Sequence, residues 1–219
     1  VEFKKLEFMA DGGKLVKGLN KIGKNLFADS KVLPQTEREA NLQKFLEKSK
    51  VKEKMYRGAT PHFQLEGEPI FVSPTVRFAE KFPVGSASPR IAANQNQTIY
   101  PLHVNATNPF DYENTNDIQK VIYEISKSDP EQAEKLKNEF KYYLDMGDKF
   151  GSQTGNWGLI ENTLVQDAIK KLGYDSFYVN EEGIKNLGVY DPSQVKTAIG
   201  NQGTFDPNDV DMTKANGGE

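Results

Sequence analysis

The strongest constraint on the fold is the order in which short strand-like segments and helical patterns follow one another from residue 54 onward. The strand-like segments are rich in β-branched and aromatic residues. Helices stand between them without strict strand–helix–strand alternation, which favours an α+β domain over a doubly wound parallel sheet. The predicted strands are 54–58, 69–73, 98–104, 176–179 and 188–190, and the predicted helices are 74–82, 117–125, 130–144 and 156–172, the last ended by Gly173.

Residues 1–50 are predicted to be a helical N-terminal segment or linker. A helix over residues 37–48 would begin at Thr36 as its cap, with Glu39 at the capping-box position. Before it, residues 14–26 form a basic amphipathic pattern, which is typical either of docking on a partner or membrane or of a solvated helix face. Its apolar positions are Leu15, Val16, Leu19, Ile22 and Leu26, and its basic ones are Lys14, Lys17, Lys21 and Lys24.

Composition excludes several classes of function. The chain has no cysteine, which rules out disulfides, thiolate metal sites and cysteine nucleophiles. It has two histidines, His62 and His103, which argues against a multi-histidine zinc site, so we expect no metal. A net charge of −3 gives no general case for nucleic-acid binding. No apolar run reaches the roughly 20 residues that a membrane span needs, and no signal-peptide pattern is present.

The predicted domain spans residues 51–214, followed by a frayed tail at 215–219. At 37% hydrophobic residues, this length suffices for a real core. Residues 83–97 are rich in Ser, Ala, Asn and Gln, which predicts a loop or lid.

Two short motifs offer residues for binding or chemistry. In the first, Met55-Tyr56-Arg57-Gly58, the guanidinium provides a planar fork for phosphate, and the glycine lets a ligand approach the backbone. The alternative for Arg57 is a surface ion pair. In the second, Ser73 stands where a strand turns into a helix, either as the cap of that helix or facing a pocket.

The order of the motifs resembles the ADP-ribosyltransferase superfamily, most closely the ADP-ribosyltransferase domains of phage and mobile-element polyvalent proteins. The likeness covers roughly residues 54–211, and its most specific part is a closing pattern. The motifs are Tyr56-Arg57-Gly58, Phe71-x-Ser73 with Ala79-x-x-Phe82, Gly173-Tyr174-Asp175, and Val189-Tyr190-Asp191-Pro192; the closing pattern is Gln194-Val195-Lys196-Thr197-Ala198 with Gly200-Asn201-x-Gly203-Thr204-Phe205-Asp206-Pro207.

The resemblance implies a split β-sandwich of two small sheets with flanking helices and with NAD, as substrate, in the cleft between the sheets. Arg57 then contacts the phosphate and ribose of NAD, and the backbone of Gly58 holds the nicotinamide amide. Ser73 occupies the second catalytic position, and Phe71 can stack on nicotinamide. Tyr56 and Gln194 complete the expected NAD contacts.

The third catalytic position departs from the family pattern. The family usually carries a glutamate just before the strand that ends in Val-Tyr-Asp, and Asn186 stands there in this chain. An amide can hydrogen-bond a ribose hydroxyl but brings no negative charge. Glu181 and Glu182, on a predicted loop just before, are the candidates to replace the carboxylate. Glu161 is a further candidate, with a solvent-facing helix position as its alternative.

Three functions remain open from the sequence. The resemblance implies a toxin-like, phage-encoded mono-ADP-ribosyltransferase or NAD glycohydrolase, acting on a host protein in the host cytoplasm or from the virion. The second function, favoured by Asn186, is a catalytically weak NAD-binding or structural module of a phage particle. The third is a small nuclease that uses His62 and His103 as an acid–base pair, and the acidic composition argues against it.

Overall fold

The computed structural model describes residues 32–59, 69–81, 98–146 and 155–211. Leu33–Glu219 form one compact unit. This unit includes helix α2 (Gln35–Leu46), which was predicted to belong to the N-terminal segment. The basic pattern at 14–26, the loop at 83–97 and the tail at 215–219 lie outside the described residues. Within the described ranges, no helix is long and apolar enough to cross a bilayer.

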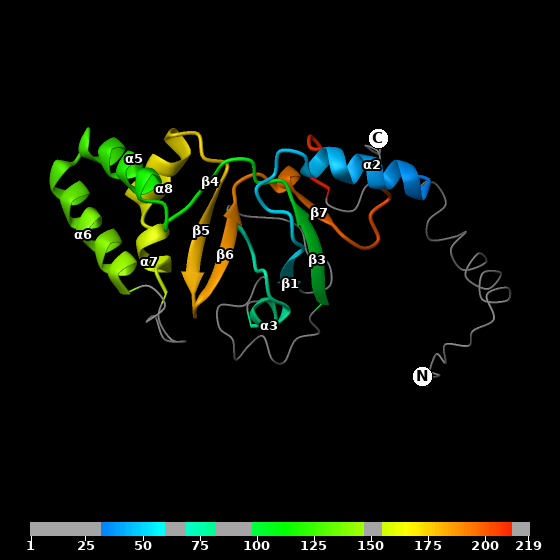
Figure 1. Cartoon of the computed structure of the whole chain (residues 1–219), viewed down its shortest axis with the longest axis horizontal. Coiled ribbons are helices and arrows are strands. Elements are labelled where there is room, and N and C mark those ends of the chain that lie inside the picture. Colours follow the sequence, from blue (N-terminus) through cyan, green and yellow to red (C-terminus); the bar gives the residue numbers. More distant parts are fainter. Residues whose placement is uncertain (1–31, 60–68, 82–97, 147–154, 212–219) are drawn as a thin grey trace. The chain divides into compact units, whose positions relative to one another are not determined.

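Two small sheets carry the fold (Figure 1). The first is antiparallel, in the order β1-β3-β7, and the second has the order β2-β6-β5-β4, with only β4 and β5 parallel. This arrangement, with helices beside the second sheet, confirms the predicted α+β class. The strands are β1 (Met55–Ala59), β2 (Ile70–Val72), β3 (Thr98–Val104), β4 (Pro109–Phe110), β5 (Ser176–Glu181), β6 (Ile184–Val189) and β7 (Val195–Thr197).

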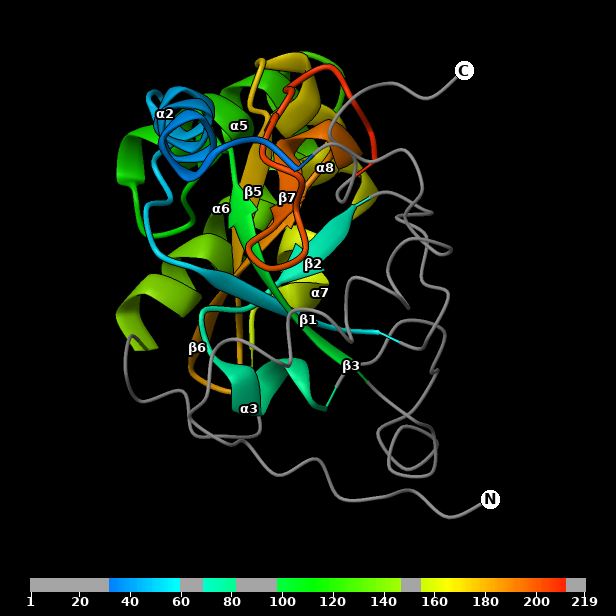
Figure 2. The ribbon, with the colours of Figure 1, turned by 90° about the vertical axis from the view of Figure 1, so that its right-hand side faces the viewer.

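Among the described residues, one backbone bridge connects the two sheets. Tyr56 of β1 donates its backbone N–H to the carbonyl of Ser73 at 2.7 Å, and Ser73 donates back to Tyr56 at 2.9 Å. Figure 2 shows β1 and β2 next to each other at this junction. Since Ser73 directly follows β2, the edge strand of one sheet is thereby attached to the edge strand of the other.

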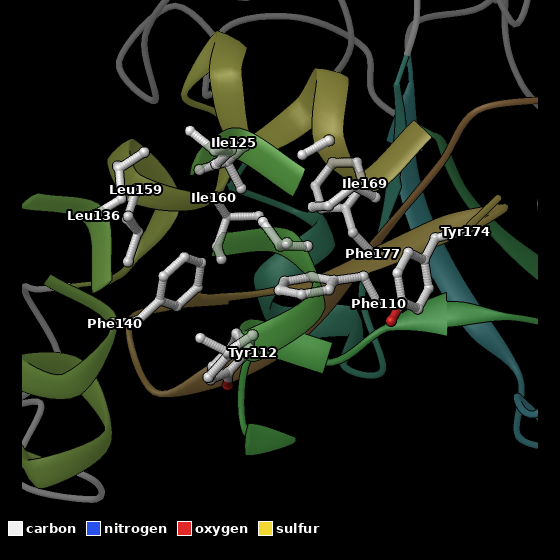
Figure 3. Close-up of a cluster of buried hydrophobic side chains, with 14 of the residues drawn as sticks. Phe110, Tyr112, Ile125, Leu136, Phe140, Leu159, Ile160, Ile169, Tyr174 and Phe177 are labelled. Atoms are coloured by element: carbon white, nitrogen blue, oxygen red, sulfur yellow. The ribbon is translucent and has the colours of Figure 1, made fainter. Parts of the chain in front are cut away.

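Two apolar clusters fill the unit. The first lies where the sheets face each other and includes Met55, Val72, Leu102 and Leu187. The second lies between the four-stranded sheet and the helices (Figure 3). Side chains alternate between the two faces of the sheet along each strand, so successive residues of β5 and β6 point into different clusters. The helices of the second cluster are α5 (Thr115–Ser126), α6 (Pro130–Met146), α7 (Trp157–Ile160) and α8 (Thr163–Lys171).

The prediction of one helix over 156–172 is wrong. The chain forms α7 and α8, separated at Asn162, whose backbone is non-helical and whose side chain accepts from the N–H of Leu164 at 3.0 Å. Asparagine competes with the helix in this way and is favoured as a cap. Gly173 ends α8 with φ of +79°, as predicted.

Helix α2 also begins differently from the prediction. Pro34 is its cap residue and makes no side-chain capping bond, so Thr36 and Glu39 do not form the expected capping box. Glu39 instead accepts a hydrogen bond from the side chain of Gln35 at 2.8 Å. Because proline fixes φ near the value that a helix start needs, it begins the helix without a side-chain cap.

The Gly-Tyr-Asp motif is architectural. The Tyr174 hydroxyl donates to the carboxylate of Asp117 on α5 at 2.8 Å. The carboxylate of Asp175 accepts the backbone N–H groups of Thr107 and Asn108 at 2.7 and 3.0 Å, just before β4. These bonds attach the start of β5 to the helices and to the edge strand.

Gly188 provides the first testable prediction. It lies between Phe71 and Phe177, whose rings meet edge to face with centroids 5.8 Å apart. A Cβ at this position would lie 2.5 Å from the Phe177 ring. Gly188→Ala should therefore lower the free energy of unfolding by about 1–3 kcal/mol in urea titration.

Gly158→Ala is the matched control, because a Cβ there meets nothing within 4 Å. Its stability should be unchanged or raised by up to about 1 kcal/mol, the helix preference of alanine over glycine. Equal effects of the two substitutions would contradict the packing described for Gly188.

Candidate active site

The three positions that the sequence predicts for catalysis lie on neighbouring strands. Arg57 is on β1, Ser73 follows β2, and Asn186 is on β6. Val72 pairs with Leu187, so the next residues along these antiparallel strands are Ser73 and Asn186. Ser73 is also bridged to Tyr56, the neighbour of Arg57. The register thus places Tyr56, Ser73 and Asn186 side by side across the junction, with Arg57 next to Tyr56. Arg57, Ser73 and Asn186, the three positions predicted to be catalytic, are called the catalytic row below.

Arg57 is held against the second sheet. Its Nη1 donates to the carbonyl oxygen of Phe71 on β2 at 2.7 Å. Burial lowers the pKa of Arg57 to about 10, so the guanidinium remains a cation at neutral pH. A cation that is partly removed from water interacts strongly with an anion that reaches it.

Gly58 has a packing role in addition to the predicted backbone role. A Cβ at position 58 would lie 2.3 Å from the carbonyl oxygen of Ala79 in helix α3 (Val76–Ala79). Glycine therefore allows α3 to pack directly on β1, next to Arg57.

Ser73 is not the cap of the following helix, which was one of its two interpretations from sequence. Thr75 caps α3 by accepting from the N–H of Phe78 at 3.3 Å. The Ser73 hydroxyl oxygen accepts from the N–H of Thr75 at 3.2 Å and lies 3.4 Å from the Thr75 hydroxyl. Ser73 is 3% exposed, so its hydroxyl belongs to a closed local network in the catalytic row. Helix α3 is also shorter than the predicted 74–82.

Asn186 is hydrogen-bonded to a carboxylate. Its Nδ2 donates to Oε2 of Glu181 at 2.7 Å. Glu181 is not on a loop, as predicted, but is the last residue of β5. Val179 pairs with Asn186, so Glu181 and Asn186 are diagonal neighbours on one face of the sheet. Asn186 is 1% exposed, and its Oδ1 has no hydrogen-bond partner among the described residues.

The charge of Glu181 is set by its surroundings. Burial raises the pKa of the Glu181 carboxyl above its usual range, the hydrogen bond from Asn186 opposes this rise, and the neighbouring charge of Glu182 adds to it. Partial burial of the carboxyl and the charge of Glu181 likewise raise the pKa of Glu161. Glu161 follows α7 and is exposed, as its alternative interpretation held.

Glu182 points to a different partner. It forms a two-residue turn with Gly183, both at positive φ (52° and 78°), between β5 and β6. Its carboxylate pairs with Lys81, which follows α3. No local pattern predicts this ion pair, because its members are 101 residues apart.

Phe71, Tyr56 and Gln194 lie differently from the other predicted residues. The ring of Phe71 packs against the helix-side cluster, and its carbonyl holds Arg57. Tyr56 alternates with Arg57 along β1, so its side chain is on the opposite face, while its backbone holds Ser73. Gln194 accepts from the N–H of Asp191 at 3.1 Å and donates to the carbonyl of Asn105 at 3.0 Å.

Gln194 is therefore remote from the catalytic row. Arg57 pairs with Tyr100 on β3, and Asn105 lies five residues further along the same chain direction. At about 3.3 Å per residue, this corresponds to roughly 16 Å. The structure thus places Gln194 in a structural turn, η2 (Pro192–Gln194), rather than beside Arg57.

The remaining expectations concern histidines and metals. His103 lies on β3, and His62 is outside the described ranges, so their pairing stays a hypothesis. In the part of the chain that the structure describes, no group of three or more His, Asp or Glu side chains could hold a metal ion.

Comparison with known families assigns the chain. A family model described as ADP-ribosyltransferase in polyvalent proteins matches residues 36–205, which is more than half of the 219 residues. The chain belongs to this family. The match confirms the resemblance found in the sequence and begins earlier than the predicted likeness, so this ADP-ribosyltransferase domain includes helix α2. No curated protein and no solved structure matches it.

The role of Arg57 in joining the sheets of the ADP-ribosyltransferase domain can be tested by stability. Arg57→Met keeps much of the aliphatic stem but leaves the Phe71 carbonyl without this donor. The free energy of unfolding should fall by about 1–3 kcal/mol in urea titration. The control, Arg77→Met, alters an exposed residue of α3 and should change stability by less than about 0.5 kcal/mol. If both variants unfold at the wild-type midpoint, the Arg57–Phe71 bond contributes nothing.

Proposed function

We propose that this domain cleaves the bond between nicotinamide and ribose in NAD and transfers ADP-ribose to a macromolecular acceptor. The acceptor is a host protein, and the enzyme is phage-encoded, toxin-like and active in the host cytoplasm or from the virion. Family membership and the position of Arg57, Ser73 and Asn186 on adjoining strands at the junction support this proposal. The main observation in its favour is the hydrogen bond from Asn186 to Glu181. This bond holds a carboxylate next to the position where the family usually carries a glutamate.

The reaction requires a negatively charged group near the ribose of NAD. When the bond to nicotinamide breaks, its electron pair leaves with the nicotinamide, and positive charge develops on the ribose. A preorganised carboxylate stabilises that charge. The amide of Asn186 cannot do so, but it orients the carboxylate of Glu181, which lies next to it on β5. An acceptor nucleophile then bonds to the ribose carbon and loses its proton; with water in that role, the outcome is NAD hydrolysis.

The other members of the row have separate tasks in this proposal. Arg57 binds the phosphate and ribose of NAD with a cation that stays charged at neutral pH. Gly58 offers its backbone to the nicotinamide amide, and Ser73 lies between Arg57 and Asn186. Tyr56 and Phe71 act as positioning residues, since their backbone groups hold Ser73 and Arg57. Gln194 positions the chain between β6 and β7.

Glu181→Gln tests the central assignment. The substitution preserves shape and removes the charge, so the rate of nicotinamide release from NAD should fall by about 10²–10³. The matched control is the adjacent Glu182→Gln, which removes the charge paired with Lys81 and should retain most of the wild-type rate. Equal losses in the two variants would show that Glu181 has no special place in the reaction.

The same time course separates the enzyme from the alternative function. If wild-type protein releases no nicotinamide while calorimetry still detects NAD binding, the domain is a binding module in which Asn186 has silenced the chemistry. Appearance of activity in Asn186→Glu would then establish that alternative. Release that labels a component of host lysate supports the transferase and begins to identify its acceptor.

The pH dependence of turnover tests the link between Asn186 and Glu181. The active form of Glu181 is the carboxylate, so kcat/KM for NAD should rise with pH through the raised pKa of this group. Asn186→Ala removes the hydrogen bond that favours the charged form of Glu181, so this limb of the profile should move to higher pH. Asn116→Ala, an exposed substitution on α5, should leave the profile in place. If the pH profile of Asn186→Ala is the same as that of the wild type, Asn186 does not affect the titration of Glu181.

A further inference from the structure

The closing segment of the chain, residues 198–205, folds over the outer face of the three-stranded sheet. His103 lies between Leu102 and Val104, which face the other sheet, so its side chain projects outward. Helix α2 covers the same face: Leu33 donates to the carbonyl of Gln202 at 3.0 Å, and Asn41 donates to that of Gly203 at 2.9 Å. This face is opposite the one that carries Met55 and Arg57.

A hollow of about 470 Å³ remains between α2 and the closing segment. It has a polar part and an apolar part. The polar part includes Arg38 and Glu39, both on α2, and His103. The apolar part is formed by Leu42, Ile199 and Phe205, and Ile199 is 66% exposed.

Two buried polar atoms at this hollow lack partners. Nε of Arg38 and Nδ1 of His103 have no hydrogen bond to any described residue. His103 is 9% exposed, and burial, followed by the nearby charge of Lys54, lowers its pKa below the usual value. The ring is therefore neutral at pH 7, and either nitrogen can carry its proton. Buried polar groups without partners are rare and costly, so two beside one hollow indicate a ligand that supplies them.

The backbone of the closing segment packs closely against Arg38 and His103. Phe205 adopts φ of +48°, which is unfavourable for a bulky side chain, and its ring is buried between Phe45 and His103 at centroid distances of 6.2 and 6.1 Å. A Cβ at Gly203 would lie 2.0 Å from Cγ of Arg38. Strained positions of this kind persist where the surrounding structure fixes them and cluster at ligand sites.

We propose that this hollow is a second binding site, specific for an organic carboxylate with an apolar body. Arg38 Nε and His103 Nδ1 each donate a hydrogen to the carboxylate, and Leu42, Ile199 and Phe205 contact the body. One full positive charge beside the carboxylate of Glu39 suits a monoanion better than a doubly charged phosphate. The ligand is a free acid or the carboxyl end of a peptide, which share this chemistry. The site lies on the face of the sheet opposite Arg57, so its residues are distinct from the catalytic row.

The test uses the full chain and the ring signals of its two histidines in NMR. The probes are phenylacetate and N-acetylphenylalanine, with phenylacetamide as the uncharged match and inorganic phosphate as a simple anion. One histidine signal, identified as His103 by its loss in His103→Asn, should shift saturably with a carboxylate probe and not with phenylacetamide or phosphate. Tighter binding of N-acetylphenylalanine identifies a peptide end as the source, and tighter binding of phenylacetate identifies a free acid.

Arg38→Met keeps the stem that packs on Gly203 and should weaken the carboxylate about tenfold, the equivalent of one charge-assisted hydrogen bond. Arg77→Met, on exposed α3, should leave the affinity unchanged. Should phenylacetamide or phosphate shift the His103 signal as strongly as phenylacetate, or should no probe shift it, the site does not exist as proposed. The comparison of acid with amide uses wild-type protein, so it decides the question even if Arg38→Met does not fold.

Discussion

The backbone pair between Tyr56 and Ser73 is the contact on which the rest of the structure depends. Without it, β1 and β2 would be edge strands of two separate small sheets, each exposing unpaired backbone groups. With it, the two sheets share an apolar cluster, and Arg57 reaches the carbonyl of Phe71. The same pair brings the strands of the catalytic row together, because Ser73 connects β1 on one side with β6 on the other. Stability and site geometry therefore come from one junction.

Burial gives a physical reason for an asparagine at position 186, where the family resemblance leads us to expect a glutamate. Asn186 is almost fully buried, and an ionised carboxylate in such a place loses much of its hydration. Glu181, at the end of β5, is only partly buried, so the same charge costs less there. The amide of Asn186 bridges the two positions and favours the charged form of Glu181. In the proposed function, a diagonal pair across two strands thus shares the task that the family resemblance assigns to a single glutamate.

Local patterns predicted the elements well and the contacts between elements poorly. Strand 98–104 and the helices near 117–125 and 130–144 follow from periodicity, and the family motifs predict Arg57, Ser73 and Asn186 as site residues. The break at Asn162 was missed because an asparagine cap looks like an ordinary polar residue within an apolar period. The choice between Glu181 and Glu182 depends on strand register and on the side to which a two-residue turn points its side chains. Neither strand register nor turn geometry can be deduced from the spacing of residues. The sequence therefore predicts Glu181 and Glu182 as equal candidates.

The closing pattern, the most specific part of the family resemblance, shows why a motif need not mark the catalytic centre. Gln194 and Asp191 cap a short turn, and the side chain of Gln194 binds the end of β3. Two residues later, Lys196 is fully buried, and its ammonium donates to the backbone carbonyls of Asp209 and Asp211. Burial lowers the pKa of Lys196, and the surrounding aspartates oppose this effect. An ammonium out of water is tolerated only where such partners compensate it, so the segment that supplies them must return over the sheet. That return places Gly203 and Phe205 against Arg38 and His103, and it is the physical origin of the hollow on the outer face.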